Sequence, residues 1–128
     1  MAHARASIGT TNYAVSIAAG RHQLNADEGM KLGGKDTGPA PYELLCSALG
    51  ACTAITVRMY AERKGWPLRG LHVDVRFESK DKKGAIMRVL SFEGELDDDQ
   101  RARLADIAER TPVTLTLKQG VVITTSVV

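Results

Sequence analysis

The sequence predicts an α+β fold, with helices packed on antiparallel sheet, and the order of its expected elements carries that prediction. Short strands come first, a long helix follows, and then come two strands, two shorter helices and a final strand. Strands that follow one another through short turns pair antiparallel, and helices grouped after them cover a sheet face. The length of 128 residues and the 44% hydrophobic content suit one core, so we expect a single domain over residues 1–128.

The first quarter of the chain predicts a hairpin followed by a loop. Residues 14–17 and 22–24 favour β-structure and flank a turn at Gly20. The segment 27–41 contains four glycines and, at its end, two prolines. No packed helix or strand tolerates so many breakers, so this segment is predicted to be a loop.

Residues 42–64 predict the central helix, about 34 Å long at 1.5 Å per residue. Pro41 suits a first helical turn, and Gly65 suits a helix end. The expected apolar stripe at helical spacing consists of Leu45, Leu49, Cys52, Thr56 and Met59. Another side carries small residues that let a second backbone approach closely, namely Ser47, Ala48, Gly50, Ala51 and Ala54.

The second half of the chain predicts a β-meander and two helices. Residues 71–78 alternate apolar and polar, and 85–96 return as a strand after a polar turn. Three aspartates open a helix over 97–110, whose apolar face we expect at Leu104, Ile107 and Ala108. Thr111 as N-cap before Pro112 predicts a short helix that ends at Gly120, and residues 121–128 predict a closing strand.

Composition excludes several classes of function. The net charge of +2 is small and its basic residues are dispersed, so we expect no nucleic-acid partner. We find no apolar run of about 18 residues and no secretory signal, and two cysteines do not form a disulfide framework. We therefore expect no membrane span and a cytoplasmic location. No metal or other cofactor is expected, because the histidines lack partners at metal-ligand spacing: His3, His22 and His72.

The two cysteines leave both a structural and a chemical reading open. Cys46 and Cys52 lie six positions apart, so on one helix they are separated by about 120° and about 9 Å, too far for a disulfide. Cys46 reads as a core residue. Spacing alone favours the same for Cys52, because its helical neighbours are apolar and it lies about ten residues from the helix start, beyond the reach of that helix's dipole.

Two longer motifs change the weight of these readings. The stretch "GPAPYELLCSALGACTAITVRMYAERKGW" and the later "FEGELDDDQRARLADIAERTPV" together resemble the OsmC/Ohr superfamily of osmotically inducible and organic-hydroperoxide-resistance proteins. The matching features are Pro41, the Glu-Leu-Leu run from Glu43, the small residues leading to Cys52, and the acidic helix that runs into Pro112-Val113. The resemblance extends over essentially the whole chain.

This resemblance implies a fold and a chemistry. It implies one OsmC-like domain in an intertwined homodimer, with antiparallel sheets wrapped around long central helices and sites at the subunit interface. It also implies a thiol peroxidase in which Cys52 attacks a peroxide and becomes a sulfenic acid. Glu43 matches a glutamate shared among branches of the family and is the second candidate catalytic residue.

The sequence departs from the family pattern at three places. Thr111 stands where the second redox cysteine is expected, so an intramolecular disulfide cycle is closed to this chain. Thr10 and Thr11 stand where the hydroperoxide-resistance branch has an arginine, which leaves Arg5 and Arg21 as substitutes. Tyr42 stands at that branch's acidic position. Nine helical positions also set Glu43 and Cys52 about 180° apart, so their cooperation requires the dimer interface or a bent helix start.

Two functions therefore remain. The first is reduction of organic or hydrogen peroxides in an oxidative stress response, a peroxiredoxin-like activity with one redox-active cysteine, Cys52, that an external thiol regenerates. The second is a non-catalytic dimer that binds a small apolar or electrophilic ligand at the subunit interface. The missing second cysteine and arginine favour the second.

Overall fold

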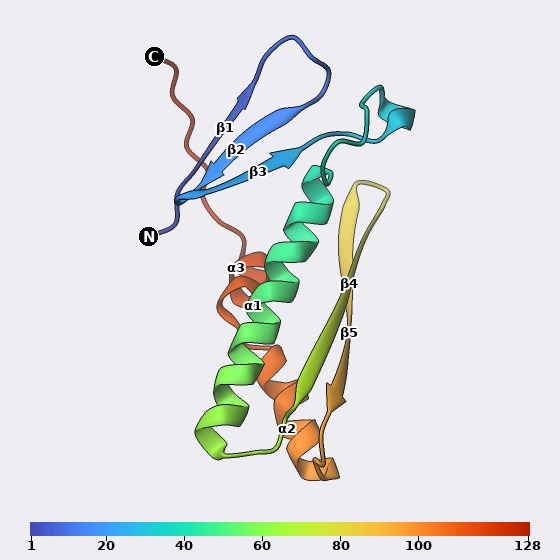
Figure 1. The fold of residues 1–128 in the computed structure, drawn as a ribbon, viewed down its shortest axis with the longest axis vertical. Helices are drawn as coiled ribbons and strands as arrows, with labels where there is room; N and C mark the ends of the chain where they lie inside the picture. The colour runs from blue at the N-terminus through green and yellow to red at the C-terminus, as the bar shows by residue number, and fades with distance from the viewer. The chain divides into compact units, whose positions relative to one another are not determined.

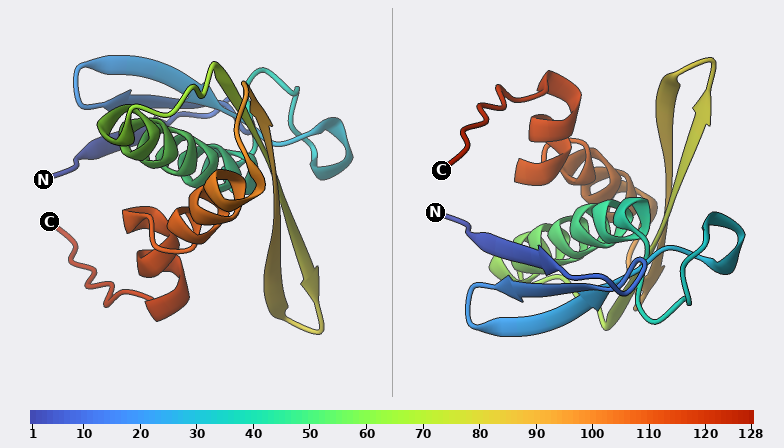
Figure 2. Two further views of the ribbon diagram at one scale, coloured as in Figure 1. Left: turned by 90° about the horizontal axis from the view of Figure 1, so that it is seen from below. Right: turned by 90° about the horizontal axis from the view of Figure 1, so that it is seen from above.

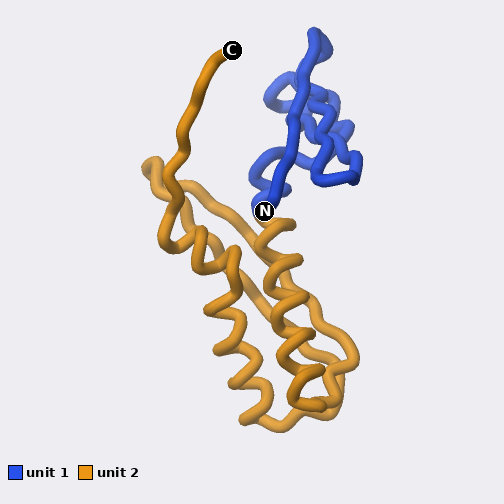
Figure 3. The backbone as a smooth tube through the Cα atoms, turned by 90° about the vertical axis from the view of Figure 1, so that its left-hand side faces the viewer, with its two compact units in different colours: residues 1–45 blue, residues 46–128 orange.

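The computed structural model describes residues 1–128 and divides them into two compact units, Met1–Leu45 and Cys46–Val128. Figure 3 shows the backbone of each unit in its own colour. Both units contain antiparallel strands, and three α-helices occur with them, one before and two after the second sheet, so the predicted α+β class is confirmed.

The first unit is built on a three-stranded antiparallel sheet in the order β1-β2-β3 (Figure 1). Its strands are β1 (Ala4–Ile8), β2 (Val15–Ala19) and β3 (His22–Ala26). The predicted hairpin is β2–β3, with Gly20 in its turn at φ +59°, a conformation that a residue without a side chain adopts readily. β1 was not predicted, because its residues are all exposed and include a single β-branched side chain, that of the last residue, Ile8.

The predicted loop after β3 folds around the buried carboxylate of Asp27. Its two oxygens accept hydrogen bonds from the backbone amides of Tyr13, Glu28, Lys35 and Thr37 and from the Thr37 hydroxyl. A single 3₁₀ turn, Met30–Leu32, interrupts the loop. One side chain therefore organises the loop that leads to the long helix.

The long helix α1 (Pro41–Lys64) begins at the end of the first unit and continues through the second. Its ends agree with the prediction, and Gly65 adopts φ +69° directly after the last turn. The strands β4 (Gly70–Lys80) and β5 (Lys83–Glu93) then form an antiparallel hairpin, with Asp81 and Lys82 at positive φ in its tight turn.

Two helices complete the second unit, α2 (Asp98–Ala108) and α3 (Pro112–Gln119). Asp97 caps α2 in a reciprocal capping box with Gln100, and Thr111 caps α3. Figure 2 shows α1, α2 and the β4–β5 hairpin meeting within this unit. Their shared core contains the buried residues Val57, Ala61, Leu68, Leu96, Leu104 and Ala108.

The buried stripe of α1 differs from the predicted one. Leu49 is buried as predicted, but the stripe continues through Thr53, Val57 and Ala61 in steps of four residues. Met59, predicted to be in the stripe, is 55% exposed, and Ile55 is equally exposed. The stripe turns this way because the hairpin and α2 pack against one side of α1 and leave another apolar side open.

The predicted strand over residues 121–128 is not formed. These residues have no regular secondary structure, and the valine and isoleucine side chains are exposed, with Val122 at 94%. A strand requires a neighbouring strand for its backbone hydrogen bonds, and no strand pairs with this segment within the chain.

Contrary to the expectation that the chain has no apolar run of this length, α1 is long and apolar enough to cross a membrane by length and composition alone. The core helix of a globular protein meets the same two criteria, so this finding is weak support for a membrane span. Four residues of α1 are buried against the rest of the chain.

Candidate functional site

The thiol of Cys52 contacts the start of another helix. Cys52 lies in the fourth turn of α1 and is half-buried, and the backbone amide of Val113 in α3 donates to its Sγ at 3.5 Å. The contact joins residues 61 positions apart in the chain. The positive end of α3 therefore faces the sulfur.

The local sequence explains why the Val113 amide points at the sulfur. Pro112 takes the first helical position and has no N–H. The Thr111 hydroxyl accepts from the Thr114 amide, so Val113 carries the first amide of α3 that this cap leaves free. The motif Thr-Pro-Val thus directs one backbone donor to Cys52.

A nearly buried arginine lies behind this contact. One nitrogen of the Arg88 guanidinium donates to Thr53 Oγ1 at 3.0 Å and to Thr114 Oγ1 at 2.8 Å. These two threonines directly follow Cys52 and Val113 in the chain. The Arg88 side chain is 11% exposed, and its other terminal nitrogen lies 3.7 Å from a carboxylate oxygen of Glu109.

The hydroxyl groups around Arg88 form a closed network. The Oγ1 atoms of Thr111 and Thr114 are 2.6 Å apart, and the Thr114 hydroxyl donates to the carbonyl of Ala108 at 3.4 Å. The Thr53 hydroxyl donates to the carbonyl of Leu49 at 2.7 Å. No buried side-chain nitrogen or oxygen lacks a hydrogen bond in the structure. The buried polar atoms of this network are therefore all paired.

Glu109 and Lys118 complete the charges of this cluster. Lys118 Nζ donates to Glu109 Oε2 at 3.0 Å. The hydrogen bond from Lys118, with the charge of Arg88 as a smaller contribution, lowers the pKa of Glu109 below its ordinary value. Two cations and one carboxylate give the cluster a net charge of +1.

Sequence reasoning missed Arg88, although the sequence contained a signal for it. In the hairpin Val75 pairs with Arg88, Val73 with Leu90 and Phe77 with Ile86. Since side chains alternate between the two faces of a strand, Arg88 lies on the same apolar face as Ile86 and Leu90. A charge on that face has to find partners inside the fold.

Glu43, the second predicted catalytic residue, lies in the first turn of α1 and is exposed. Its Oε1 accepts a hydrogen bond from the Ala40 amide at 2.9 Å, which caps the helix start. α1 is one continuous helix from Pro41 to Lys64, with Glu43 in its first turn. The two other candidate cations, Arg5 in β1 and Arg21 in the β2–β3 turn, are exposed.

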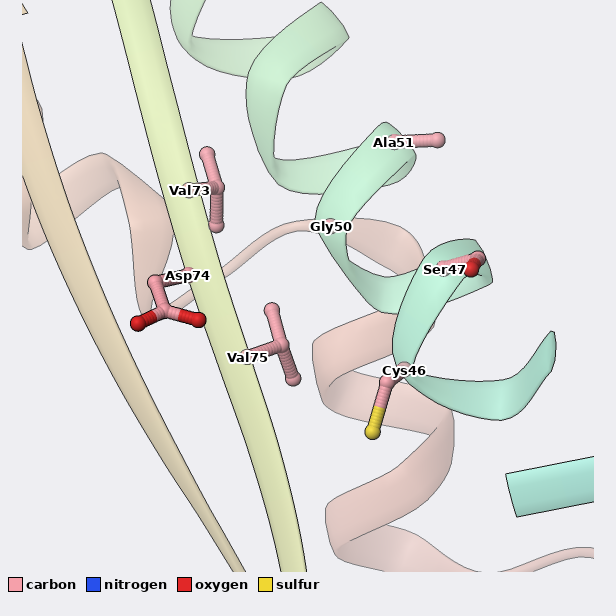
Figure 4. Close-up of a pocket in the computed structure, with 7 residues that line it drawn as sticks. All are labelled: Cys46, Ser47, Gly50, Ala51, Val73, Asp74 and Val75. Carbon is pink, nitrogen blue, oxygen red and sulfur yellow. The ribbon is translucent and has the colours of Figure 1, made fainter. Parts of the chain in front are cut away.

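Cys46 lines a shallow, open groove between α1 and β4. The groove has a volume of about 370 Å³ and is lined by Cys46, Ser47, Gly50, Ala51, Val73, Asp74 and Val75. Figure 4 shows Cys46, Val73 and Val75 between the helix and the strand, whereas Ser47 and Asp74 point away from the gap. Both cysteines are free thiols, and Cys52 is not part of this groove.

The structure brings together no group of three or more metal-ligating side chains. His72 pairs with Glu93 at 2.9 Å on the exposed face of the hairpin, and this contact lowers the pKa of the Glu93 carboxyl.

Comparison with solved structures defines the class of fold. The chain is similar to an OsmC-like protein from Mycoplasma pneumoniae, with a TM-score of 0.80 and 16% identity over 92% of this chain and 87% of that chain. It is also similar to a putative osmotic stress induced and detoxification response protein from Psychrobacter arcticus, with a TM-score of 0.78 and 17% identity over 91% and 88% of the two chains. The organic hydroperoxide resistance protein OhrB of Bacillus subtilis gives a TM-score of 0.64 and 18% identity over 91% and 90%.

The sequence itself then assigns the family. Residues 34–126 match the family described as OsmC-like protein, and the chain belongs to that family. No curated protein matches the sequence.

Proposed function

We propose that this protein reduces organic or hydrogen peroxides through Cys52 as part of an oxidative stress response. The observation that carries the proposal is the 3.5 Å contact between the Val113 amide, at the start of α3, and Cys52 Sγ. The amide donor at the start of α3 fixes the position of the sulfur, which is the atom that attacks the peroxide in this proposal. The organic hydroperoxide resistance protein of the same fold from Bacillus subtilis supports the choice of substrate.

The reaction proceeds in three balanced steps. The Cys52 thiolate attacks one peroxide oxygen of ROOH, the O–O bond breaks, and one proton is taken up, so that the products are a cysteine sulfenic acid and the alcohol ROH. An external thiol attacks the sulfenic sulfur and releases water, which leaves a mixed disulfide. A second thiol then reduces the mixed disulfide and restores Cys52, so the sum consumes one peroxide and two thiols.

The external thiol is required because Thr111, with 0% of its surface exposed, occupies the position at which a second cysteine would act. A monothiol such as glutathione or a dithiol of the thioredoxin or lipoyl kind fits this role. We propose that the protein acts in the cytoplasm, where such thiols are kept reduced.

We further propose that the working form is a homodimer. In the single chain, α1 exposes Ile55 and Met59, and residues 121–128 expose a β-branched segment without a partner strand. A second copy that packs along α1 and pairs with the terminal segment would cover both surfaces. Glu43 then acts at Cys52 only across the subunit interface.

Peroxide consumption with a supplied dithiol tests the proposed activity. We expect the wild-type protein to reduce cumene hydroperoxide with dithiothreitol and the Cys52→Ser variant to lose that turnover. Cys46→Ser is the matched control and should retain it. Glu43→Gln removes the charge but keeps an oxygen for the Ala40 amide, so any loss of activity in this variant reports on chemistry rather than on helix capping.

Wild-type turnover no faster than that of free cysteine would contradict the proposal. The second candidate function, a dimer that binds a small apolar or electrophilic ligand at the subunit interface, would then remain. The buried Thr111 favours that candidate, because it leaves the chain without its own resolving thiol. Stoichiometric labelling of Cys52 by an electrophile without peroxide turnover would distinguish it.

A further inference from the structure

We propose that Arg88 is the positioning residue of the Cys52 site. It holds the start of α3 against α1, so that the Val113 amide stays directed at the sulfur, and it supplies a positive charge to the surroundings of the thiolate. This inference rests on the proposed nucleophilic role of Cys52, and it assigns a role to a residue of β5 that contacts neither the sulfur nor a substrate.

The placement of Arg88 needs an explanation, because a buried guanidinium is costly unless it is paired. Arg88 lies in the apolar register of the hairpin, opposite Val75, and only 11% of its side chain is exposed. Its only ion pair within 4 Å is the contact with Glu109 at 3.7 Å. Its two short hydrogen bonds go instead to neutral threonine hydroxyls.

Those two threonines couple the helices that form the site. Thr53 belongs to α1 and directly follows Cys52, while Thr114 belongs to α3 and directly follows Val113. One guanidinium nitrogen bridges their hydroxyls at 3.0 and 2.8 Å. Because the bridge joins the residues next to both atoms of the sulfur contact, loss of Arg88 would free the α3 start to move relative to the thiol.

The charges of the cluster act in the same direction. Arg88 and Lys118 are cations, and both contact the single carboxylate of Glu109. The net charge of +1 attracts anionic reagents toward Cys52. A residue with a purely structural role would not change the rate with an anionic reagent relative to the rate with a neutral one.

Alkylation of Cys52 tests both parts of the inference without requiring peroxide turnover. All measurements use the Cys46→Ser background, so that a single thiol reacts, with neutral iodoacetamide and anionic iodoacetate as the two probes. We expect Arg88→Met to lower the rate with iodoacetamide about tenfold, because the Val113 amide no longer stays directed at the sulfur. We also expect a lower ratio of the iodoacetate rate to the iodoacetamide rate.

Two further variants separate charge from packing. Arg88→Lys keeps the charge but not the forked donor, so it should preserve the rate ratio while recovering only part of the rate. Arg76→Met is the matched control, because Arg76 lies exposed on β4 and pairs with Asp74 at 3.6 Å. It should leave both rates unchanged.

An Arg88→Met protein that is folded by circular dichroism and alkylates at the wild-type rate and ratio would overturn the inference. If Arg88→Met does not fold, Glu109→Gln decides the matter, since Glu109 is 59% exposed and its loss leaves two cations unopposed. An unchanged rate ratio in this variant overturns the inference, and a raised ratio supports it. Rapid, Arg88-dependent alkylation without peroxide turnover would refute the proposed function alone.

Discussion

At the scale of single residues, Thr111 separates this chain from a self-contained disulfide cycle. Its hydroxyl caps α3, and its side chain is fully buried beside Thr114. The position lies two residues before the amide that contacts Cys52. A thiol at position 111 would therefore lie at the start of α3, which is the helix start that Cys52 contacts.

The first prediction is that Thr111→Cys creates an internal redox pair. On addition of one equivalent of peroxide, we expect a disulfide between Cys52 and the introduced thiol, detected by mass spectrometry of non-reduced peptides. Loss of the threonine cap should lower the free energy of unfolding by about 1 kcal/mol. Thr111→Ser, which keeps a hydroxyl cap, is the control. Oxidation of Cys52 to sulfinic acid with no disulfide would contradict the prediction.

In the first unit, Asp27 is the single residue whose side chain organises the loop after β3. Hydrogen bonds from the Thr37 hydroxyl and amide, together with those from the Glu28 and Tyr13 amides, hold the pKa of its carboxyl well below the ordinary 3.8. Since the folded-state pKa is depressed, the ionised carboxylate contributes stability above pH 3.8. That contribution is lost as the pH falls below this value toward the folded-state pKa.

The second prediction follows from this sign. Asp27→Asn should lower the melting temperature at pH 7, and the difference from wild type should shrink as the pH is lowered to about 3. Circular dichroism melts at both pH values measure it. The control is Asp36→Asn in the same loop, where φ is +55° and asparagine is well tolerated. A difference that stays constant with pH would contradict the assignment.

At the scale of elements, α2 depends on a capping box. The Gln100 amide donates to Asp97 Oδ1 at 2.7 Å, and the Asp97 amide donates to Gln100 Oε1 at 3.0 Å. Leu104 and Ala108 of this helix lie in the core of the second unit. Because Val57 and Ala61 of α1 lie in the same core, fraying of the start of α2 would also weaken the packing of α1.

The third prediction is that Asp97→Ala lowers the free energy of unfolding by about 1 kcal/mol, as measured by urea titration. Asp99→Ala removes an acidic residue of the same first turn that lies outside the capping box, and it should cost a few tenths of a kcal/mol. Equal losses in the two variants would show that charge at the helix start matters more than the hydrogen bonds of the box.

The elements that could be predicted are those whose signal is local. The β4–β5 hairpin follows from strict alternation, and α1 follows from its flanking proline and glycine. Local signals could not show whether residues 121–128 form a strand. These residues have strand propensity, but a strand forms only where a partner strand is present. The buried side of α1 likewise depends on which elements pack against it.

The surroundings of Cys52 could not be predicted from the sequence, because they are formed by contacts between residues that are far apart in the chain. Along α1 alone, Cys52 has apolar neighbours and no helix start nearby, which favours a structural cysteine. The start of α3 reaches it from 61 positions away. Arg88 was visible in the sequence as a charge within an apolar alternation, although its threonine partners were not.

At the scale of the whole molecule, the surfaces left open in one chain have a common property. Ile55 and Met59 on α1 are each 55% exposed, and Val122 and Ile123 of the terminal segment are exposed still further. The burial of such side chains against a second copy stabilises a dimer by about 25 cal/mol for each Å² of apolar surface. A homodimer accounts for both surfaces with one interaction.

The fourth prediction is that the protein sediments as a dimer and that Ile55→Glu shifts it toward monomer. A carboxylate at the centre of an apolar interface has to be desolvated, and this cost weakens association by at least about 1.4 kcal/mol, or tenfold. Lys82→Glu makes a charge change in the β4–β5 turn instead of on α1 and should remain dimeric. Analytical ultracentrifugation over a range of concentrations measures the dissociation constants. A wild-type monomer, or an Ile55→Glu protein that dimerises as tightly as wild type, would contradict an interface along α1.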